Sequence, residues 1–534
     1  MVSVPEPIVI RGGLVLDGTG EPGRNADVLV VDGRIARIGE VDRSIAAAEI
    51  DAGGCVVTPG FIDVHSHADF TVLAFPSAES AVMQGVTTVV TGNCGGGIAP
   101  AGPEHDVRRV AFAYHPDWGV EITWSTFPEY MARLKNLGVN VAPLVPHGAV
   151  RNAVMGLSSR GPSRRELETM CLLVAEAMEA GAVGLSTGLE YQPGCHAGVD
   201  EIAELAGPVA DRGGLYATHM RNRAEAFAAA TKEALEVSRR SGARLQLSHV
   251  APRPYAPRDE VERAFGAIEL ARSDGLQVWV DTFPETWGPG LLGDLFPREI
   301  MQGPPAEILA RLRDPKGRRR VAEYFANRQN FLVRAGGYEQ IFIAASPTRP
   351  ESVGRALTGL AEQASTTVAE WCCDALLTAG PMLMSVAIRH VYATEEALRR
   401  VLRLPYCSLG SDGVVTSGEG ADCRYPWNAS TYGYAPRTLG RYAGEEGLFT
   451  VEEAVRRLAA VPAEAVGLTD RGLLSEGRAA DVVVLDLSGL RDRTRPDDMA
   501  RFPRGIEHVL VNGVPVVSAG APTGARPGGV VRPG

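Results

Sequence analysis

The sequence predicts an α/β protein with a central (β/α)8 barrel, TIM-like in outline, and a small β-sandwich built from both termini. Apolar, strand-like runs alternate with helical patterns through the middle of the chain, and short β-rich runs with tight turns occupy both ends. Polar residues that can bind a metal follow several central strands directly. We expect residues 1–57 and 471–534 to form the sandwich and a C-terminal tail, and residues 58–470 to form the barrel.

The predicted sandwich depends on β-rich runs that are far apart in the chain. Asp32-Gly33 joins two such runs near the N-terminus, and Asn512-Gly513 joins two near the C-terminus. Both dipeptides favour the two-residue turns of β-hairpins. Neither end alone has enough strands to cover its own apolar face, so one shared domain is favoured over two unrelated appendages.

The barrel is predicted from eight strand-like runs. Seven follow the run that ends at His65, at residues 86–90, 139–145, 182–186, 214–219, 245–249, 276–281 and 406–412. Helical patterns lie between most of them, for example at Arg164–Ala180 and Arg223–Arg240. Near-continuously apolar strands that alternate with helices indicate a covered parallel sheet. An open, doubly wound sheet is the alternative, but no Gly-x-Gly-x-x-Gly follows the first strand.

The segment from about residue 284 to 378 is too long for a single crossover between strands. We expect an insertion over the barrel mouth, as a lid or as a solvated decoration away from the site. Its basic run, Lys316–Arg320, is interpreted as a solvated face.

Composition excludes several classes of protein. The formal charge of -11 comes without a basic patch interleaved with aromatic residues, so nucleic acid is not an expected partner. No signal peptide or long uncharged apolar stretch is present, so no membrane association is expected. The eight cysteines are irregularly spaced, which favours reduced thiols in the cytoplasm. The sequence leaves open whether the protein forms an oligomer.

The first strand ends in Asp63-Val64-His65-Ser66-His67. Side chains two residues apart in a strand share one face, so His65 and His67 point the same way and form a pair of potential metal ligands. By themselves, two such histidines are also compatible with a core or surface position.

Further potential ligands follow other strands. Barrel strands present their carboxyl ends at one face, where barrel enzymes build their sites. A metal site is therefore expected from residues at corresponding positions of five strands: His65, His67, Cys94, His219, His249 and Asp412.

The ordered motifs resemble those of one family, the N-acyl-D-amino acid deacylases (D-aminoacylases) of the amidohydrolase superfamily. The resemblance covers nearly the whole chain. It is carried by residues 60–67 (Gly-Phe-Ile-Asp-Val-His-Ser-His), 92–95 (Gly-Asn-Cys-Gly), 184–191, 218–222 (Thr-His-Met-Arg-Asn), 248–249 and 410–413 (Gly-Ser-Asp-Gly).

The resemblance implies a zinc enzyme. Cys94, His219 and His249 would hold a tightly bound zinc, while His65, His67 and Asp412 would surround a second, weaker position. A thiolate with two imidazoles suits zinc and leaves a place for water.

Many members of the superfamily bridge two metals with a carboxylated lysine on the fourth strand. This chain has Gly188-Leu189-Glu190 there and no lysine. Cys94 is therefore the expected bridge, with Glu190 a less favoured contributor.

Asp412 is the expected catalytic residue. Zinc lowers the pKa of bound water to about 7 and polarises a carbonyl. Asp412 would accept the water proton and deliver it to the departing amide nitrogen. The alternative is that Asp412 serves only as a ligand or as a helix cap.

The resemblance weakens in the substrate pocket. Relatives place a lysine just after the sixth-strand histidine and tyrosines after the seventh-strand aspartate, whereas this chain has Val250-Ala251-Pro252 and then Phe283 and Glu285. A substrate carboxylate would then be bound by Arg424, by the alternative Arg437, or by Arg253.

The other expected substrate contacts are Tyr191 with the scissile carbonyl and a supporting role for His147 with Arg151. Remaining histidines, including His390, are expected to be ordinary ones.

The expected function is a zinc-dependent hydrolase of a linear amide in an N-acyl amino acid, a small molecule with a free carboxylate. The alternatives are action on a dipeptide, an L-amino acid conjugate or a specialised metabolite, then a cyclic amidase, which the missing strand-four lysine disfavours. A metal-free binding protein on the same fold is the alternative outside enzymes.

Overall fold

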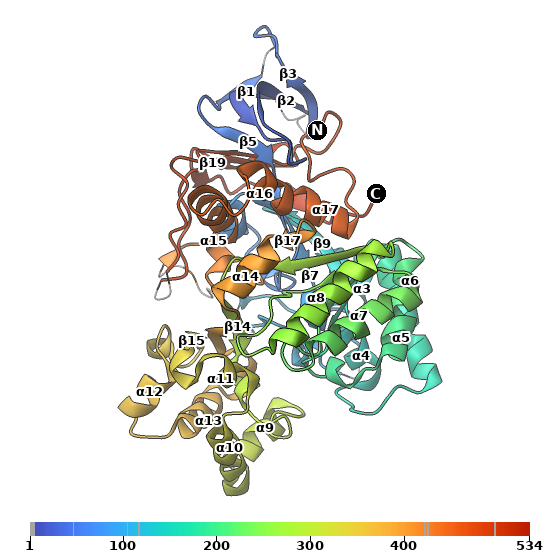
Figure 1. The fold of residues 1–534 in the computed structure, drawn as a ribbon, viewed down its shortest axis with the longest axis vertical. Helices are drawn as coiled ribbons and strands as arrows, with labels where there is room; N and C mark the ends of the chain where they lie inside the picture. Colours follow the sequence, from blue (N-terminus) through green and yellow to red (C-terminus); the bar gives the residue numbers. More distant parts are fainter. Residues whose placement is uncertain are drawn as a thin grey trace.

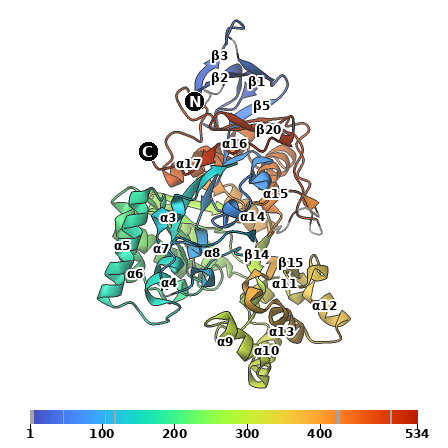
Figure 2. The same ribbon diagram turned by 180° about the vertical axis from the view of Figure 1, so that it is seen from behind.

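A computed structural model describes residues 6–45, 47–103, 105–115, 118–420, 423, 427–495 and 498–534. The protein has three parts along its longest axis, seen from opposite sides in Figures 1 and 2. A sheet drawn in blue and red lies at one end, the barrel occupies the middle, and a unit in olive and yellow lies at the other end.

Both ends of the chain contribute to one nine-stranded sheet. Its central junction pairs β5 with β18, with Val57 opposite Val484, so sequence-distant strands share one ladder. This confirms the predicted small β domain from both termini, whose strands form one continuous hydrogen-bonded sheet. The strands are β1 (Ile8–Val15), β2 (Arg24–Val31), β3 (Arg34–Gly39), β4 (Ala48–Asp51), β5 (Val56–Pro59), β18 (Val482–Leu485), β19 (Ile506–Val511), β20 (Val514–Ser518) and β21 (Ala521–Pro522).

Eight parallel strands form the barrel. The barrel closes between its last and first strands, where the Asp412 amide donates to the His65 carbonyl at 2.9 Å and the His67 amide to the Gly413 carbonyl at 2.6 Å. The predicted (β/α)8 barrel is thus confirmed. Its strands are β6 (Phe61–Asp63), β7 (Val86–Thr91), β9 (Asn140–Pro146), β10 (Gly184–Gly188), β11 (Leu215–His219), β12 (Arg244–Leu247), β13 (Val278–Thr282) and β17 (Cys407–Leu409).

Helices surround the barrel with apolar faces toward the strands. They include α4 (His147–Met155), α5 (Arg164–Ala180), α6 (Val199–Ala210), α7 (Phe227–Ser241), α8 (Arg258–Ser273), α14 (Glu395–Leu402), α15 (Ser430–Arg437), α16 (Val451–Leu458) and α17 (Ala460–Val466). Helix α5 begins where predicted, after a capping box of Ser163 and Glu166. No helix among the described residues is both long and apolar enough to cross a bilayer.

Helix α7 begins at Phe227 and not at the predicted Arg223. The Asn222 side chain accepts hydrogen bonds from the amides of Ala224 and Ala226, at 2.7 and 3.1 Å. Such local bonds compete with helix formation. Arg223 therefore lies in a loop after β11 and not on the outer helix.

The third part is the insertion, a unit with its own hydrophobic cluster that includes Leu312, Trp371 and Leu376. An antiparallel sheet of β14 (Trp287–Leu291), β15 (Ile341–Ala345) and β16 (Ala387–Val391) joins it to the barrel. Trp287 in β14 is paired with Val391 in β16, so the start and end of the insertion lie side by side. Strand β16 lies beyond residue 378, where we expected the segment to end. The helices are α9 (Pro305–Arg313), α10 (Pro315–Asn327), α11 (Phe331–Gly336), α12 (Leu357–Gln363) and α13 (Val368–Ala379).

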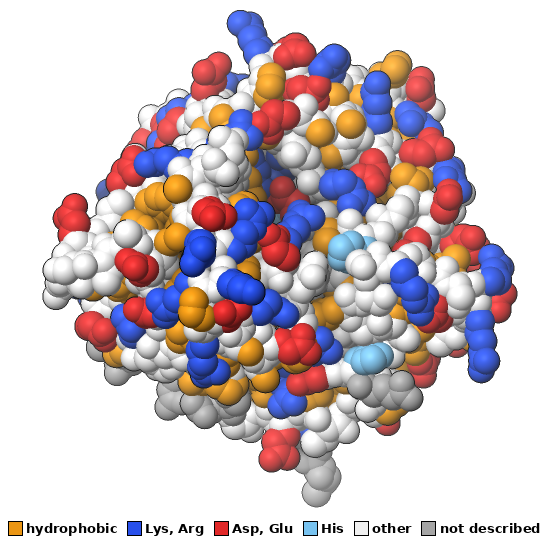
Figure 3. All heavy atoms as spheres, turned by 90° about the horizontal axis from the view of Figure 1, so that it is seen from below, with side chains coloured by type: hydrophobic (Ala, Val, Ile, Leu, Met, Phe, Trp, Pro, Cys, Tyr) orange, Lys and Arg blue, Asp and Glu red, His pale blue; other side chains and the backbone are white. Residues whose placement is uncertain are grey.

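Seen from the insertion side, the surface carries basic and acidic side chains in alternation around a hollow (Figure 3).

Candidate metal centre

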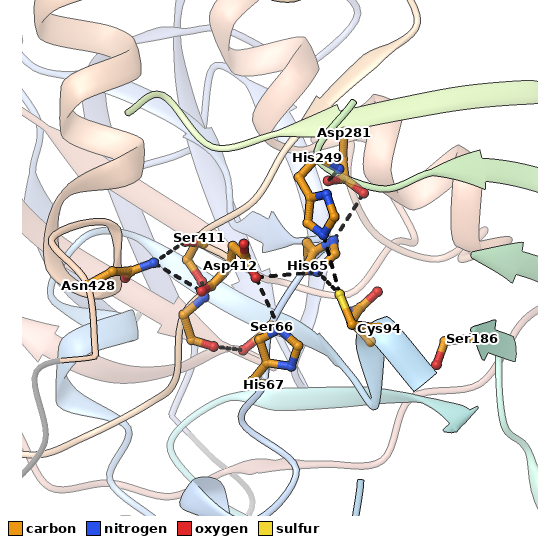
Figure 4. A network of polar contacts seen from close by, with 12 residues as sticks. His65, Ser66, His67, Cys94, Ser186, His249, Asp281, Ser411, Asp412 and Asn428 are labelled. Atoms are coloured by element: carbon orange, nitrogen blue, oxygen red, sulfur yellow. Dashed lines mark hydrogen bonds and ion pairs between the residues drawn. The ribbon is translucent and has the colours of Figure 1, made fainter. Parts of the chain in front are cut away.

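The structure brings the six predicted ligand residues together at the carboxyl ends of the barrel strands. Figure 4 shows five of them: His65, His67, Cys94, His249 and Asp412. His65 and His67 follow β6, and Cys94 lies in the turn Asn93–Gly95 after β7. His219 is the last residue of β11, His249 follows β12, and Asp412 follows β17. All six side chains are buried.

Two groups of three residues have the geometry of a metal site. Cys94, His219 and His249 form one group, and His65, His67 and Cys94 form the other. Within each group the possible ligand atoms all lie within 4.8 Å of one another. Cys94 belongs to both groups, which is the arrangement of a bridging ligand.

Distances within the cluster connect all its parts. The Cys94 sulfur lies 3.2 Å from His65 Nε2 and 3.4 Å from His249 Nε2. Asp412 Oδ1 lies 3.0 Å from His67 Nε2 and 3.5 Å from His65 Nε2. Asp412 is outside both groups of three, but it adjoins the second one.

The cluster shifts the pKa values of its own members. Burial alone would raise the pKa of the Cys94 thiol, but the neighbouring His65 and His249 lower it well below its ordinary value. Burial would likewise raise the pKa of Asp412, which the hydrogen bond from His67 and the histidine charges instead lower to about 2. The pKa of His67 is raised to about 9 against the effect of burial. Cys94 and Asp412 are therefore anionic, as metal binding and base catalysis require.

Three of the cluster residues have left-handed backbone conformations, with φ of 53° at Cys94, 35° at His249 and 46° at Asp412. This conformation costs a non-glycine residue about 1–2 kcal/mol. Hydrogen bonds hold it at Asp412, whose carbonyl accepts from Trp427 Nε1 and Asn428 Nδ2, each at 3.0 Å. Such strain is typical of functional sites.

The turn that contains Cys94 packs closely against the backbone of β10. A Cβ on Gly188 in β10 would lie 1.9 Å from the Cys94 carbonyl oxygen, so only glycine fits there. The glycine predicted from the family motif thus has a packing reason.

Asp281, at the end of β13, orients the His65 imidazole and holds the backbone amide of His249. Its carboxylate lies 3.2 Å from His65 Nδ1 and accepts hydrogen bonds from the His249 amide at 2.7 Å and Gln246 Nε2 at 2.6 Å. A carboxylate on the outer nitrogen fixes the tautomer of a metal-binding histidine. The sequence placed Asp281 at a strand end but did not indicate this role.

Glu190 has the same relation to His219. Its Oε2 lies 2.8 Å from His219 Nε2 and accepts a hydrogen bond from Arg253 at 2.6 Å. Burial would raise the pKa of Glu190, but Arg253 and His219 lower it below its ordinary value. His219 Nδ1 is buried without a hydrogen-bond partner, so it is the atom available to a metal.

The residues predicted to bind substrate divide into two sets. Tyr191 and Arg253 line the cavity of about 50 Å³ next to the cluster. Glu285 lines a different cavity, where it is paired with Arg437, and His147 is bonded to Glu201 at 2.9 Å. Neither Glu285 nor His147 is among the residues that line the cavity at the cluster. Arg424 lies outside the described residues.

Arg151 shares the partner of His147. It is fully buried, and its Nη1 donates to both oxygens of Glu201 at 2.6 Å. These three residues form a structural network behind the site.

The structure adds residues that the sequence did not indicate. Arg223, Tyr392, Trp427 and Phe112 line the same cavity, together with His390, which was expected to be an ordinary histidine. They come from loops and from the insertion, where no motif marks them. The only signal was the position of Arg223 directly after the Thr218–Asn222 motif.

A family model described as the amidohydrolase family matches residues 48–286 and 335–517. The chain belongs to the amidohydrolase family. Residues 287–334, between the two matched segments, form the first part of the insertion. The family model therefore covers the barrel strands of this amidohydrolase but only part of its insertion.

Similar proteins cover essentially the whole of this amidohydrolase. An N-acyl-D-glutamate deacylase from Alcaligenes xylosoxydans xylosoxydans is 36% identical over 98% of this chain and 96% of its own length. A D-aminoacylase from the same organism is 31% identical over 99% of this chain and 98% of its own. A crystal structure of an N-acyl-D-glutamate deacylase from Bordetella bronchiseptica, complexed with zinc and a phosphonate that mimics the tetrahedral intermediate, is 32% identical, with a TM-score of 0.81 over 99% of both chains.

Proposed function

We propose that this protein is a zinc-dependent amidohydrolase that cleaves the linear amide bond of an N-acyl amino acid. The observation that carries the proposal is the buried Cys94, His219 and His249 group at the barrel mouth, with Asp412 beside it. The family membership and the full-length similarity to deacylases point to the same reaction.

The donor set fits zinc. A thiolate and two imidazoles are ligands that zinc prefers, and three protein ligands leave one position open. His219 Nδ1 is buried without a hydrogen-bond partner and His249 Nε2 lies 3.4 Å from the Cys94 sulfur, while Glu190 is bonded to the outer nitrogen of His219. His65, His67 and the shared Cys94 would hold a second, weaker ion. When bound, zinc supplies a water of lowered pKa and a Lewis acid for a carbonyl oxygen.

We assign proton transfer to Asp412. Its Oδ1 is bonded to His67 and lies near His65, while Oδ2 has no hydrogen-bond partner among the described residues. Asp412 is anionic before reaction, so it can accept the proton of the attacking water. It then delivers that proton to the amide nitrogen as the carbon–nitrogen bond breaks.

We assign the scissile carbonyl to Tyr191. Burial and then the negative charge of Cys94 raise the pKa of Tyr191 well above its ordinary value, so its hydroxyl remains a hydrogen-bond donor. Its ring lies against His219, with ring centroids 4.6 Å apart. A donor beside the cluster stabilises the charge that develops on the carbonyl oxygen.

The test is to load the purified protein with zinc, measure the zinc content, and follow amine release from paired N-acyl-D- and N-acyl-L-amino acids and dipeptides. We expect release from N-acyl amino acids and its loss after chelation, with recovery on adding zinc. Zinc-loaded protein that releases no amine from any member of the panel would overturn the proposal.

We also assign the protein to the cytoplasm. All eight cysteines are free, with none in a disulfide. Free thiols are typical of a reducing compartment.

A further inference from the structure

Arg223 is a buried arginine whose charge acts on Glu190, a carboxylate that is already paired with Arg253. The exposed fraction of Arg223 is 4%, and among the described residues it forms no ion pair. A buried charge normally has an opposite charge as partner, because desolvation is costly. An arginine left unpaired beside a reaction centre therefore suggests a ligand that brings the negative charge.

The contacts of Arg223 hold its guanidinium in one orientation. Nη1 donates to the carbonyls of His249 at 2.7 Å and Ala251 at 3.1 Å, and the guanidinium carbon lies 5.0 Å from the ring centroid of Tyr392. The buried Nε has no hydrogen-bond partner, and no bond to Nη2 occurs among the described residues. The Nε and Nη2 edge is the one that binds a carboxylate in bidentate fashion.

Arg253 differs, although it lines the same cavity. Its guanidinium is paired with Glu190, so its charge is already balanced within the protein. Arg223 and Arg253 are both close to the cluster, but among the described residues only Arg253 has an ion-pair partner.

We infer that Arg223 binds the free carboxylate of the substrate's amino acid half, next to the scissile amide. The inference rests on the proposed function and identifies the residue that selects acidic substrates. The small cavity of about 50 Å³ suits a compact group such as a carboxylate.

The test uses the Asp412→Asn variant loaded with zinc, in which binding is measured without turnover. Calorimetry gives Kd for an N-acyl amino acid and for the matching carboxamide, with and without Arg223→Met. We expect Arg223→Met to weaken carboxylate binding about 10- to 100-fold and to change carboxamide binding by less than about threefold. Arg223→Lys should recover part of the loss.

The matched control is Arg240→Met on α7, because Arg240 has its own partner in Asp200 and lines neither cavity. It should leave the ratio of the two affinities unchanged. Equal weakening of carboxylate and carboxamide binding by Arg223→Met would show a structural role and overturn the inference. Since Kd does not depend on turnover, this failure is distinct from failure of the proposed function.

A second observation concerns the other side of the cluster. A cavity of about 690 Å³ shares Cys94, Phe112, Tyr191, Leu291 and Phe331 with the small one, so the two adjoin at the reaction centre. Its wall includes the apolar Phe296, Met301 and Met384 of the insertion. Neither Arg223 nor Arg253 lines it. An acetyl group would leave most of this cavity unfilled, although its lining also includes charged residues such as Arg108, Asp294 and Arg298.

We propose that the acyl half of the substrate is a large apolar group, such as a medium-chain fatty acyl or an aryl-acyl group, bound in this large cavity. With the carboxylate at Arg223, the scissile amide lies at the cluster and the acyl chain extends under the insertion. Burying each methylene contributes a factor of about four in affinity.

The test measures Kd of the zinc-loaded Asp412→Asn variant for acetyl, butanoyl, hexanoyl and octanoyl conjugates of one amino acid. We expect Kd to fall about fourfold per methylene. Met384→Trp, at a residue 37% exposed on the cavity wall, should weaken octanoyl binding at least about tenfold and leave acetyl binding within about twofold.

Leu270→Trp on α8 is the control, since Leu270 is 61% exposed and does not line the cavity. It should change neither affinity. A Kd that stays flat or rises with chain length would overturn the proposal.

Discussion

The floor and the wall of the site are built differently. The floor comprises the six clustered residues at the strand ends, which are buried and bonded to one another and to Asp281 and Glu190. The wall comprises the residues of the insertion that line the large cavity, and it is held by a separate hydrophobic cluster. The family model matches the strands that carry the floor but not residues 287–334 of the wall.

This difference indicates that the floor and the wall have different functions. Barrel strands fix ligand atoms to within a few tenths of an ångström, as proton transfer and metal binding demand. In the proposed binding mode the wall mainly meets the acyl half of the substrate, so its sequence can vary as long as its volume and polarity suit that group. Substitutions in the floor should therefore change chemistry, and substitutions in the wall should change selectivity.

The largest effect is expected from Cys94→Ala, which removes the donor shared by both groups of ligands. Zinc content should fall below about a tenth of an equivalent and activity should fall at least about 1000-fold. Elemental analysis and amine release measure the two effects. Cys407→Ala is the control, because Cys407 is equally buried in β17 but outside both groups. A Cys94→Ala protein with a full equivalent of zinc would contradict the assignment.

Asp412→Asn separates proton transfer from metal binding. The amide keeps the size of the side chain but cannot accept a proton, so kcat should fall about 10²- to 10⁴-fold with zinc content unchanged. Kinetics and elemental analysis on one preparation suffice. If the variant had near-native rates, Asp412 would serve only as a metal ligand or as a helix cap.

Glu190→Gln tests the residue behind the floor. The variant keeps a hydrogen-bonding group at His219 but loses the charge that pairs with Arg253. Zinc affinity should fall about 10- to 100-fold, as for other residues that orient a metal ligand. Competition with a chelator measures it. Unchanged affinity would indicate that Glu190 serves only to balance Arg253.

Leu376→Ala should have the smallest effect on chemistry. Leu376 is fully buried in α13, and its truncation should cost about 2–5 kcal/mol of unfolding free energy in the insertion. Zinc affinity should stay unchanged, because the cluster of the insertion is separate from that of the barrel. Hydrogen exchange should rise in residues 292–388 only. Leu172→Ala, at a residue 71% exposed on α5, is the control. A parallel loss of zinc would show that floor and wall are one unit.

The sequence predicted much of the floor, because a histidine or cysteine directly after an apolar strand has few possible positions in a barrel. The alternation of strands and helices predicted the barrel itself, and the turn dipeptides predicted the shared terminal domain.

Arg223 could not be found in the same way. The apolar spacing of its neighbours placed it at the start of a helix, whereas the Asn222 side chain bonds to the amides of Ala224 and Ala226 and the helix begins later. Nor does a sequence reveal which arginine lacks a carboxylate partner. Arg253 and Glu190 are 63 residues apart, and only folding pairs them.

The wall was predicted only as an insertion. Its residues approach the site by tertiary packing, with no strand end to mark them. His390 illustrates this, since it lies in β16 at the far end of the insertion but lines the cavity at the cluster.

The pairing of Trp287 with Val391 brings the two junctions of the insertion together in one ladder. A segment that leaves and re-enters the barrel at neighbouring points can be replaced by another segment without changing the spacing of the barrel strands. Grafting other segments between these two strands is therefore a practical route to amidases with new acyl preferences. Over evolutionary time, recombination at the same two points would let one zinc chemistry serve many substrates.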